Sequence, residues 1–389
     1  MASTRDYYDY LRDQVPEMTA ELERYVTIES GSRDKAGIDR VGRVVSEAFS
    51  ELGFDIERIE EPVSGDHLVA RRRGSGSGTL LALIHLDTTW PAGSLAAFPY
   101  HVEDGIAYGP GIRDMKGGWV VLLWALRALR QASWDGLGEL RVFMTGDEEL
   151  GSPRGRQWIE REARTADWAL VMEPARDGGN LVTSRGMVGA VYFAIEGKAI
   201  HNSNRHLGTG ASAVAEAAHK ILALEALNDT ERGVLVNVGT IAGGAARQIV
   251  PDRAQLSIDL RAANPDDAEE LVERVQQIAE QTFIPGVTTV MSGGITRPAF
   301  RNSAGGERLL RLAQDCGSQI GLSLDGIYVR SGSDGNFTAA LGVPTLDGLG
   351  PEAGAGSGRN ENVLLASIPR RAALLAGIIT GLPETRGPR

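Results

Sequence analysis

Cysteine is nearly absent from this chain, since only Cys316 occurs among 389 residues. A lone cysteine excludes an intramolecular disulfide and fits a reducing compartment. Long apolar runs are absent as well, because none approaches the roughly 18 residues that a transmembrane helix needs. The N-terminal segment also lacks the apolar core of a signal peptide. We therefore expect a cytoplasmic protein without a membrane partner.

Positive charge is also scarce. The 40 lysines and arginines are outnumbered by 51 acidic residues, and the formal net charge is −11. Such a balance disfavours nucleic acids and anionic membranes as partners. Apolar residues make up 42% of the chain and charged residues 23%, as is typical of soluble globular proteins. A chain of this length is expected to form two domains.

Three short apolar segments in the first half of the chain end in histidine or acidic residues. Thr79–His85 is a continuous apolar run up to its histidine, Leu140–Thr145 precedes three acids, and Trp168–Met172 precedes Glu173. Such runs are typical of strands buried on both faces of a parallel sheet, and helical patterns separate them. The alternation predicts a doubly wound α/β sheet, in which sites lie at the carboxyl ends of strands.

The pattern changes after residue 184. Alternating strands at 188–196, 234–240 and 254–261 are interspersed with two helices rich in alanine or glutamate. This arrangement predicts a smaller α+β domain over residues 185–294. Residues 1–184 and 295–389 would then form one discontinuous α/β domain.

Strand ends and one helix start deliver one imidazole and several carboxylates to one sheet edge, namely His85, Asp114, Glu148, Glu149 and Glu173. This borderline-hard ligand set suits Zn, Mn or Co. Each residue alone has an ordinary interpretation, either a buried histidine bonded to an acid such as Asp87 or a solvated acidic turn. Acids this close raise one another's pKa unless a cation lies among them. Their convergence therefore favours a divalent metal site.

Several stretches carry a family resemblance, namely HLDTTWPAG, AYGPGIRDMKGG, TGDEELGSP, MEPA, GKAIHN, RSGSDGNFTAALGVPTLDGLGP and IPRRAALLA. In this order, along nearly the whole chain, they resemble the aminoacylase/glutamate-carboxypeptidase family of metallopeptidases. The resemblance implies a zinc-peptidase-like catalytic domain that holds two metal ions. It also implies an inserted lid domain that usually dimerises, and hence a homodimer or a higher homo-oligomer.

The resemblance implies roles for the residues at the strand ends. His85, Asp114 and Glu173 resemble the ligands of one metal, with Asp114 bridging to a second ion. Glu149 resembles a ligand of that second ion. Asp87 resembles the residue that fixes the tautomer of His85.

Three further residues resemble groups that act on the substrate. Glu148 resembles the general base that takes a proton from metal-activated water. His201 resembles a lid histidine that reaches the partner subunit's site and stabilises the oxyanion. Arg261 resembles an arginine that clamps a substrate carboxylate, although without the family it would be interpreted as a surface charge at a strand end.

The chain departs from the family pattern near the substrate. Ser357 stands where the family has its last metal-binding histidine, and a serine hydroxyl is a poor zinc ligand at neutral pH. We therefore expect one firmly bound ion per chain rather than two. Gln248 replaces a usual asparagine, and Arg330 with Ser331 replaces a glycine pair. These four residues are candidate substrate contacts.

The sequence thus favours a metal-dependent hydrolase that cleaves a C–N bond of a small carboxylate-bearing substrate. The first hypothesis is amide hydrolysis of an N-acyl amino acid or a C-terminal residue. The alternative is a single-metal aminohydrolase that releases ammonia from a small aromatic amino acid such as a nitroanthranilate, which would suit Gln248 and Arg330. A non-catalytic ligand-binding dimer is disfavoured, because Glu148 would serve no binding purpose that an asparagine would not.

Overall fold

The computed structural model describes residues 2–354 and 360–385. The chain forms two compact units, the first made of Met1–Ser184, Asn302–Tyr328 and Ser333–Arg389, the second of Arg185–Arg301 and Val329–Gly332. The expected return to the α/β domain at residue 295 is therefore wrong, because strand β14 (Thr288–Arg297) still belongs to the sheet of the second unit. No described helix is long and apolar enough to cross a membrane.

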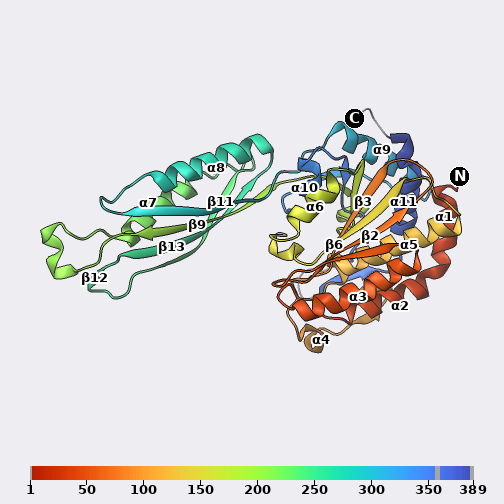
Figure 1. Ribbon diagram of the computed structural model, residues 1–389, viewed down its shortest axis with the longest axis horizontal. Coiled ribbons are helices and arrows are strands. Elements are labelled where there is room, and N and C mark those ends of the chain that lie inside the picture. Colours follow the sequence, from red (N-terminus) through yellow and green to blue (C-terminus); the bar gives the residue numbers. More distant parts are fainter. Residues whose placement is uncertain (1, 355–359, 386–389) are drawn as a thin grey trace. The chain divides into compact units, whose positions relative to one another are not determined.

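The first unit is built on a six-stranded sheet with the order β1-β2-β6-β3-β7-β16. Its strands are β1 (Asp55–Ile59), β2 (His67–Arg73), β3 (Thr79–His85), β6 (Glu139–Thr145), β7 (Trp168–Val171) and β16 (Thr345–Leu346). The pairs β6–β3, β3–β7 and β7–β16 are parallel, whereas β1–β2 and β2–β6 are antiparallel. Since β6, β3 and β7 are neighbours, their carboxyl ends meet at one edge (Figure 1).

Helices and short strands surround this sheet. The helices are α1 (Thr4–Leu11), α2 (Val15–Val26), α3 (Lys35–Glu51), α4 (Ser94–Ala97), α5 (Gly117–Gln131), α6 (Arg156–Ala163), α9 (Ala304–Ser318), α10 (Gly335–Ala340) and α11 (Ser367–Gly381). Smaller sheets pair β17 (Asn362–Leu364) with β5 (Ile106–Tyr108) and β4 (His101–Glu103), and β15 (Gly326–Val329) with β8 (Leu181–Arg185). Pro16 lies in the first turn of α2, where its missing N–H costs no helical hydrogen bond.

Strand β3 is buried on both of its faces, as its apolar run predicts. Leu80, Ala82 and Ile84 enter a core that includes α5 and α11, whereas Leu81 and Leu83 enter a second core with α6 and α10. Burying a leucine in this way stabilises the fold by about 1.5–3 kcal/mol. The end of β3, and with it the first residue of the site, is thus held by packing on both sides.

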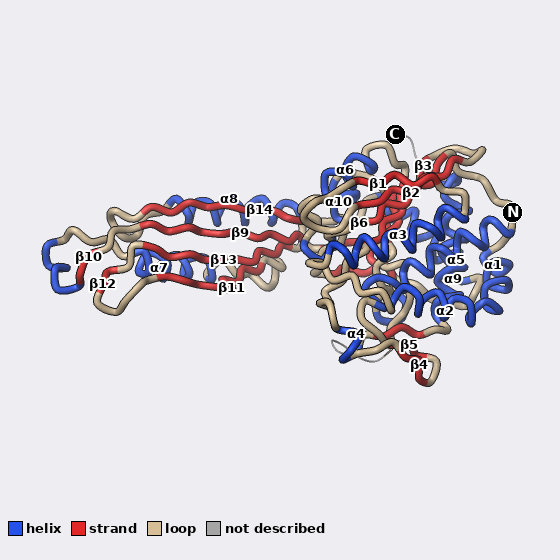
Figure 2. The backbone as a smooth tube through the Cα atoms, turned by 60° about the horizontal axis from the view of Figure 1, so that its bottom comes forward, coloured by secondary structure: helices blue, strands red, loops and turns tan. Residues whose placement is uncertain are grey.

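The second unit is an antiparallel sheet with the order β11-β13-β9-β14 and two helices. Its elements are β9 (Met187–Glu196), β10 (Ile200–His201), α7 (Ala213–Glu225), β11 (Leu235–Gly243), β12 (Ile249–Val250), β13 (Arg253–Ala262) and α8 (Pro265–Glu280), together with β14. Val191, Phe193 and Leu256 share a core with both helices, and Figure 2 shows the four strands in front with the helices behind. A doubly wound α/β unit with an inserted α+β unit confirms the predicted fold class.

Candidate active site

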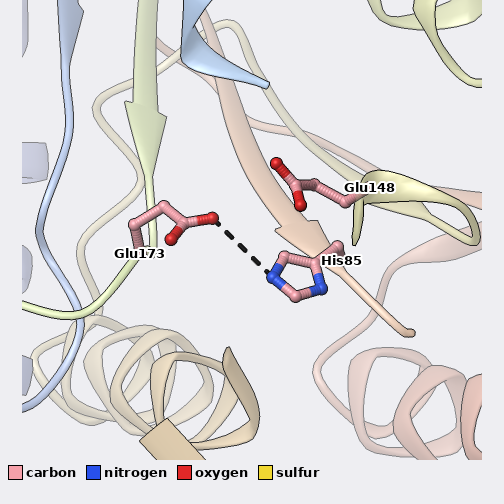
Figure 3. A group of neighbouring side chains, drawn as sticks. All are labelled: His85, Glu148 and Glu173. Carbon is pink, nitrogen blue, oxygen red and sulfur yellow. Dashed lines mark ion pairs between the residues drawn. The ribbon is translucent and has the colours of Figure 1, made fainter. Parts of the chain in front are cut away.

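Neighbouring strand ends bring two predicted ligands and the predicted general base together. His85 is the last residue of β3, Glu173 follows β7, and Glu148 begins a short 3-10 turn after β6 (Figure 3). Candidate ligand atoms of His85, Glu148 and Glu173 all lie within 4.8 Å of one another, as do those of His85, Asp114 and Glu149. The two groups share one imidazole, so all five side chains surround a single locus.

The hydrogen bonds of His85 favour a cation at this locus. Its Nδ1 lies 2.8 Å from the backbone oxygen of Asp87, so Nδ1–H donates to that carbonyl. Its Nε2 lies 3.0 Å from Oδ1 of Asp114 and 3.7 Å from Oε1 of Glu173. A lone pair on Nε2 facing carboxylate oxygens requires a proton or a metal ion between them. The donor set therefore fits a divalent ion with His85, Asp114 and Glu173 as ligands.

Burial and crowding perturb the titration of these groups. Burial lowers the pKa of His85, but the carboxylates of Asp114, Asp87 and Glu148 outweigh it and raise the pKa well above its ordinary value. Burial, with Asp114 and Glu148, raises the pKa of Glu149, against the opposing effect of His85. A divalent ion among these acids would relieve the crowding, because it favours their charged forms.

Asp87 supports the site through both its backbone carbonyl and its side-chain carboxylate. Its backbone carbonyl accepts from His85, whereas its carboxylate lies 3.6 Å from the same Nδ1. The buried carboxylate accepts the backbone N–H groups of Glu148 at 3.0 Å and of Glu149 at 3.2 Å. Asp87 therefore positions the turn that carries both glutamates, in addition to its expected contact with His85.

We expect Asp87→Asn to lower kcat/KM or metal affinity by about 10- to 100-fold, the usual cost of losing such a supporting contact. The amide presents an NH₂ group to one of two backbone N–H donors, so one hydrogen bond is lost and Glu148 or Glu149 shifts. Steady-state kinetics and metal titration measure the effect, and circular dichroism checks the fold. An unchanged kcat/KM together with unchanged metal affinity would contradict this role.

Glu361 is a site residue that the sequence analysis did not assign. One of its carboxylate oxygens accepts hydrogen bonds from the backbone N–H groups of Arg113 (2.8 Å) and Asp114 (3.0 Å). The other accepts from the backbone N–H of Gly111 (3.0 Å) and from the indole N–H of Trp90. Glu361 thus shapes the turn that presents Asp114. Its signal in the sequence was its place four residues after Ser357, the position where the family has its last metal-binding histidine.

Asp334 is a second missed residue. Its buried carboxylate accepts hydrogen bonds from Thr145 Oγ1 at 2.6 Å and from Ser152 Oγ at 2.5 Å. Thr145 precedes the acidic turn and Ser152 follows it, so Asp334 ties together both ends of the segment that carries Glu148 and Glu149. Burial raises the pKa of neighbouring Asp147 to about 7, and the acids Asp334 and Asp87 add to the shift.

Two predicted substrate residues lie at a pair of short strands in the second unit. His201 of β10 pairs with Ile249 of β12, and Gln248 immediately precedes β12, where its carbonyl accepts from Asn202 N–H at 2.7 Å. The backbone N–H of Ser203 donates to Nδ1 of His201 at 3.3 Å. Nδ1 also lies 2.7 Å from Oγ of Ser203, so with Nδ1 as the acceptor of both contacts the exposed ring carries its N–H at Nε2.

Arg261 lies on β13 and forms a two-point ion pair with Asp259. Its Nε donates to Oδ2 at 2.9 Å and one terminal nitrogen donates to Oδ1 at 3.1 Å. Because Leu260 and Ala262 enter the core beneath the helices, Arg261 lies on the opposite face of the sheet. The pair orients the guanidinium and leaves its other edge able to bind a carboxylate.

The remaining substrate candidates have different surroundings. The oxygens of Ser331 accept from the buried Arg185 guanidinium, at 3.1 Å for the carbonyl and 3.3 Å for the hydroxyl. Arg330 is exposed. Both lie in the second unit rather than in the first, where their sequence position placed them. Ser357 lies outside the described residues.

Comparison with known proteins identifies the family. A profile of peptidase family M20/M25/M40 matches residues 81–381. The chain belongs to this family. Carboxypeptidase G2 of Pseudomonas sp. (strain RS-16) is 32% identical over 393 residues, which cover 98% of this chain and 94% of that protein. A succinyl-diaminopimelate desuccinylase of Alkalilimnicola ehrlichii is 26% identical over 358 residues, covering 87% and 93%.

Solved structures of M20 peptidases have the same fold. The crystal structure of aminopeptidase PepT from Bacillus cereus superposes with a TM-score of 0.75 at 21% identity, over 95% of this chain and 99% of the other. The chain is thus a metal-dependent hydrolase that acts on C–N bonds of small substrates, as the sequence predicted. Relatives that are a carboxypeptidase and a desuccinylase do not favour the aminohydrolase or the non-catalytic alternative.

Proposed function

We propose that the protein hydrolyses the amide bond of an N-acyl amino acid or of a C-terminal residue. The observation that carries the proposal is the convergence of His85, Glu148 and Glu173 at three neighbouring strand ends, with Asp114 reaching His85 from the turn before α5. The related carboxypeptidase and desuccinylase support this bond type. Arg261, oriented by Asp259, is the candidate partner of the substrate's carboxylate.

His85, Asp114 and Glu173 would hold a divalent ion, which would lower the pKa of a bound water and polarise the scissile carbonyl. Glu148 then accepts a proton from the attacking water and returns it to the leaving nitrogen. His201 donates its Nε2–H to the oxyanion that develops on the carbonyl oxygen. Asp87 holds Glu148 at its place in the turn through the backbone N–H.

We also propose one firmly bound Zn, Mn or Co ion per chain, held by His85, Asp114 and Glu173. The same Asp114 and Glu149 form the beginning of a second site. Ser357 is the residue that would have to complete that site, and a neutral hydroxyl is a weak ligand for these ions. A second ion is therefore expected to bind more weakly than the first.

The proposed assembly is a homodimer through the second unit, in a reducing compartment such as the cytoplasm. The face of its sheet opposite α7 and α8 exposes Tyr192 and Val290, and apolar side chains on an open sheet face suit a protein partner. The exposed N–H of His201 would then serve the site of a second chain. Sedimentation equilibrium measures the stoichiometry, and a monomer at micromolar concentration would contradict it.

Substitution of Arg261 tests the substrate class. We expect Arg261→Leu to raise KM for N-acyl amino acids by about 10- to 100-fold, since a charge-assisted contact is lost, and to change kcat much less. Arg253→Leu, on the same face of the same strand, is the matched control with unchanged KM. Hydrolysis assays of N-acyl amino acids and their carboxamides measure the effect. If the metal-loaded protein hydrolyses none of the N-acyl amino acids, the proposed function is overturned.

A further inference from the structure

A cavity of about 540 Å³ adjoins the metal-ligand cluster in the first unit. Its lining includes two acids, Asp114 and Glu361, the aromatic Trp90, and two arginines, Arg113 and Arg176. Because Asp114 is a candidate metal ligand, whatever occupies the cavity lies beside the reacting bond. The cavity is large enough for several non-hydrogen atoms of a substrate.

The two acids of this wall are already engaged. Both oxygens of Glu361 accept hydrogen bonds from backbone N–H groups, and one also accepts from the Trp90 indole. Asp114 faces His85 at 3.0 Å. Within residues 2–354 and 360–385, no hydrogen bond or ion pair engages the guanidinium of Arg113. The guanidinium of Arg113 is therefore available to an anion that enters the cavity.

Both arginines stand on backbone that is held in place. The N–H of Arg113 donates to Glu361 at 2.8 Å. Arg176 begins a tight turn in which its N–H donates to the carbonyl of Asn180 at 3.0 Å and its carbonyl accepts from Gly179 at 2.8 Å. The backbone at both arginines therefore need not rearrange when the side chains bind a ligand.

Trp90 contributes an apolar surface to the lining of the same cavity. Its ring stacks on Phe98 with 5.4 Å between centroids, and its indole N–H is fixed by Glu361. A short hydrocarbon chain can pack along such a ring, while an anion at the end of the chain reaches a guanidinium. Arginine is the side chain best suited to two-point binding of a carboxylate.

We propose that Arg113 and Arg176 form a second anion subsite, which selects N-acyl amino acids whose acyl group itself ends in a carboxylate. This subsite is distinct from Arg261, which lies in the other unit and is the candidate partner of the amino-acid carboxylate. The inference rests on the proposed amide hydrolysis, because the subsite names the substrate class of that reaction. A dianionic N-acyl amino acid, with one carboxylate at each end, is the expected ligand.

The first test compares N-succinyl amino acids with their methyl esters on the acyl carboxylate, which differ in this one charge. The parent protein is expected to have a kcat/KM about 10- to 100-fold higher for the compound with the free acyl carboxylate than for its methyl ester. This ratio corresponds to the usual contribution of a hydrogen bond to a charged group. Arg113→Gln and Arg176→Gln should bring this ratio towards unity, and Arg113→Lys should retain part of it. Arg164→Gln, an exposed arginine outside the cavity, is the control with an unchanged ratio.

The second test measures binding alone and separates this inference from the proposed reaction. Metal-loaded Glu148→Gln protein is titrated calorimetrically with the same two compounds, with and without Arg113→Gln, at equal metal content by elemental analysis. Tighter binding of the acid that depends on Arg113 supports the subsite even if the parent protein hydrolyses neither compound, a result that would overturn only the reaction. Equal dissociation constants for acid and ester, or a preference that survives both arginine substitutions, would overturn the subsite.

Discussion

Replacing Glu148 with glutamine is expected to lower kcat by about 10²- to 10⁴-fold, the contribution usual for a positioned proton-transfer group. Glutamine keeps the size of the side chain but cannot accept and return a proton. The backbone N–H of residue 148 still donates to Asp87, so the turn keeps its anchor. The fold and the melting temperature should therefore change little.

The same variant distinguishes two roles of Glu148, because its carboxylate also belongs to one of the candidate ligand groups. A general base should lose kcat without losing metal affinity, whereas a ligand should lose both. Competition with a chromophoric chelator measures the affinity. Glu160→Gln is the matched control, since Glu160 is an acid on α6 that pairs with Arg156. Retention of the parental kcat would refute the proton-transfer role.

Removal of the metal by a chelator is expected to abolish hydrolysis and to lower the melting temperature. A ligand present at 1,000 times its dissociation constant stabilises the folded state by about 4 kcal/mol, and this stabilisation is lost with the ion. The apo-site then holds His85 against Asp114 and Glu173 with only a proton between them. Kinetics and differential scanning calorimetry measure the two effects. Full activity after exhaustive chelation, checked by elemental analysis, would contradict metal dependence.

Back-titration of the apoprotein also measures how many ions are needed. One equivalent of Zn, Mn or Co should restore most of the activity of the parent chain. Ser357→His supplies an imidazole at the position where the family has one and should bind a second equivalent tightly. Two tightly bound ions in the parent chain would show that the interpretation of Ser357 is wrong.

Local sequence patterns were sufficient for the strands that carry the site. The continuous apolar run of β3 predicted burial on both faces, and Leu80 and Leu81 do enter different cores. The metal site at one sheet edge was predicted from His85 at the end of β3 and from the acids that follow β6 and β7. These features are encoded by neighbouring residues, because periodicity and strand ends are local properties of the chain.

The contacts that support the site were not predictable in the same way. Glu361 and Gly111 are 250 residues apart in the sequence, and Asp334 reaches Ser152 across 182 residues. A single carboxylate that accepts loop N–H groups leaves no periodic signal. The domain boundary at residue 295 failed for a related reason, since β14 joins its sheet by pairing with the distant β9.

The sequence by itself determined the α/β class of the larger unit, the α+β insert and the residue types that converge on a metal. Only the tertiary structure decided how these residues are held. It showed that the carboxylate of Asp87 holds the turn of Glu148, that Glu361 shapes the turn of Asp114, and that Arg113 and Arg176 share a cavity. The physical reason is that strand formation follows local side-chain patterning, whereas hydrogen bonds between loops depend on segments that meet only after the sheet has assembled.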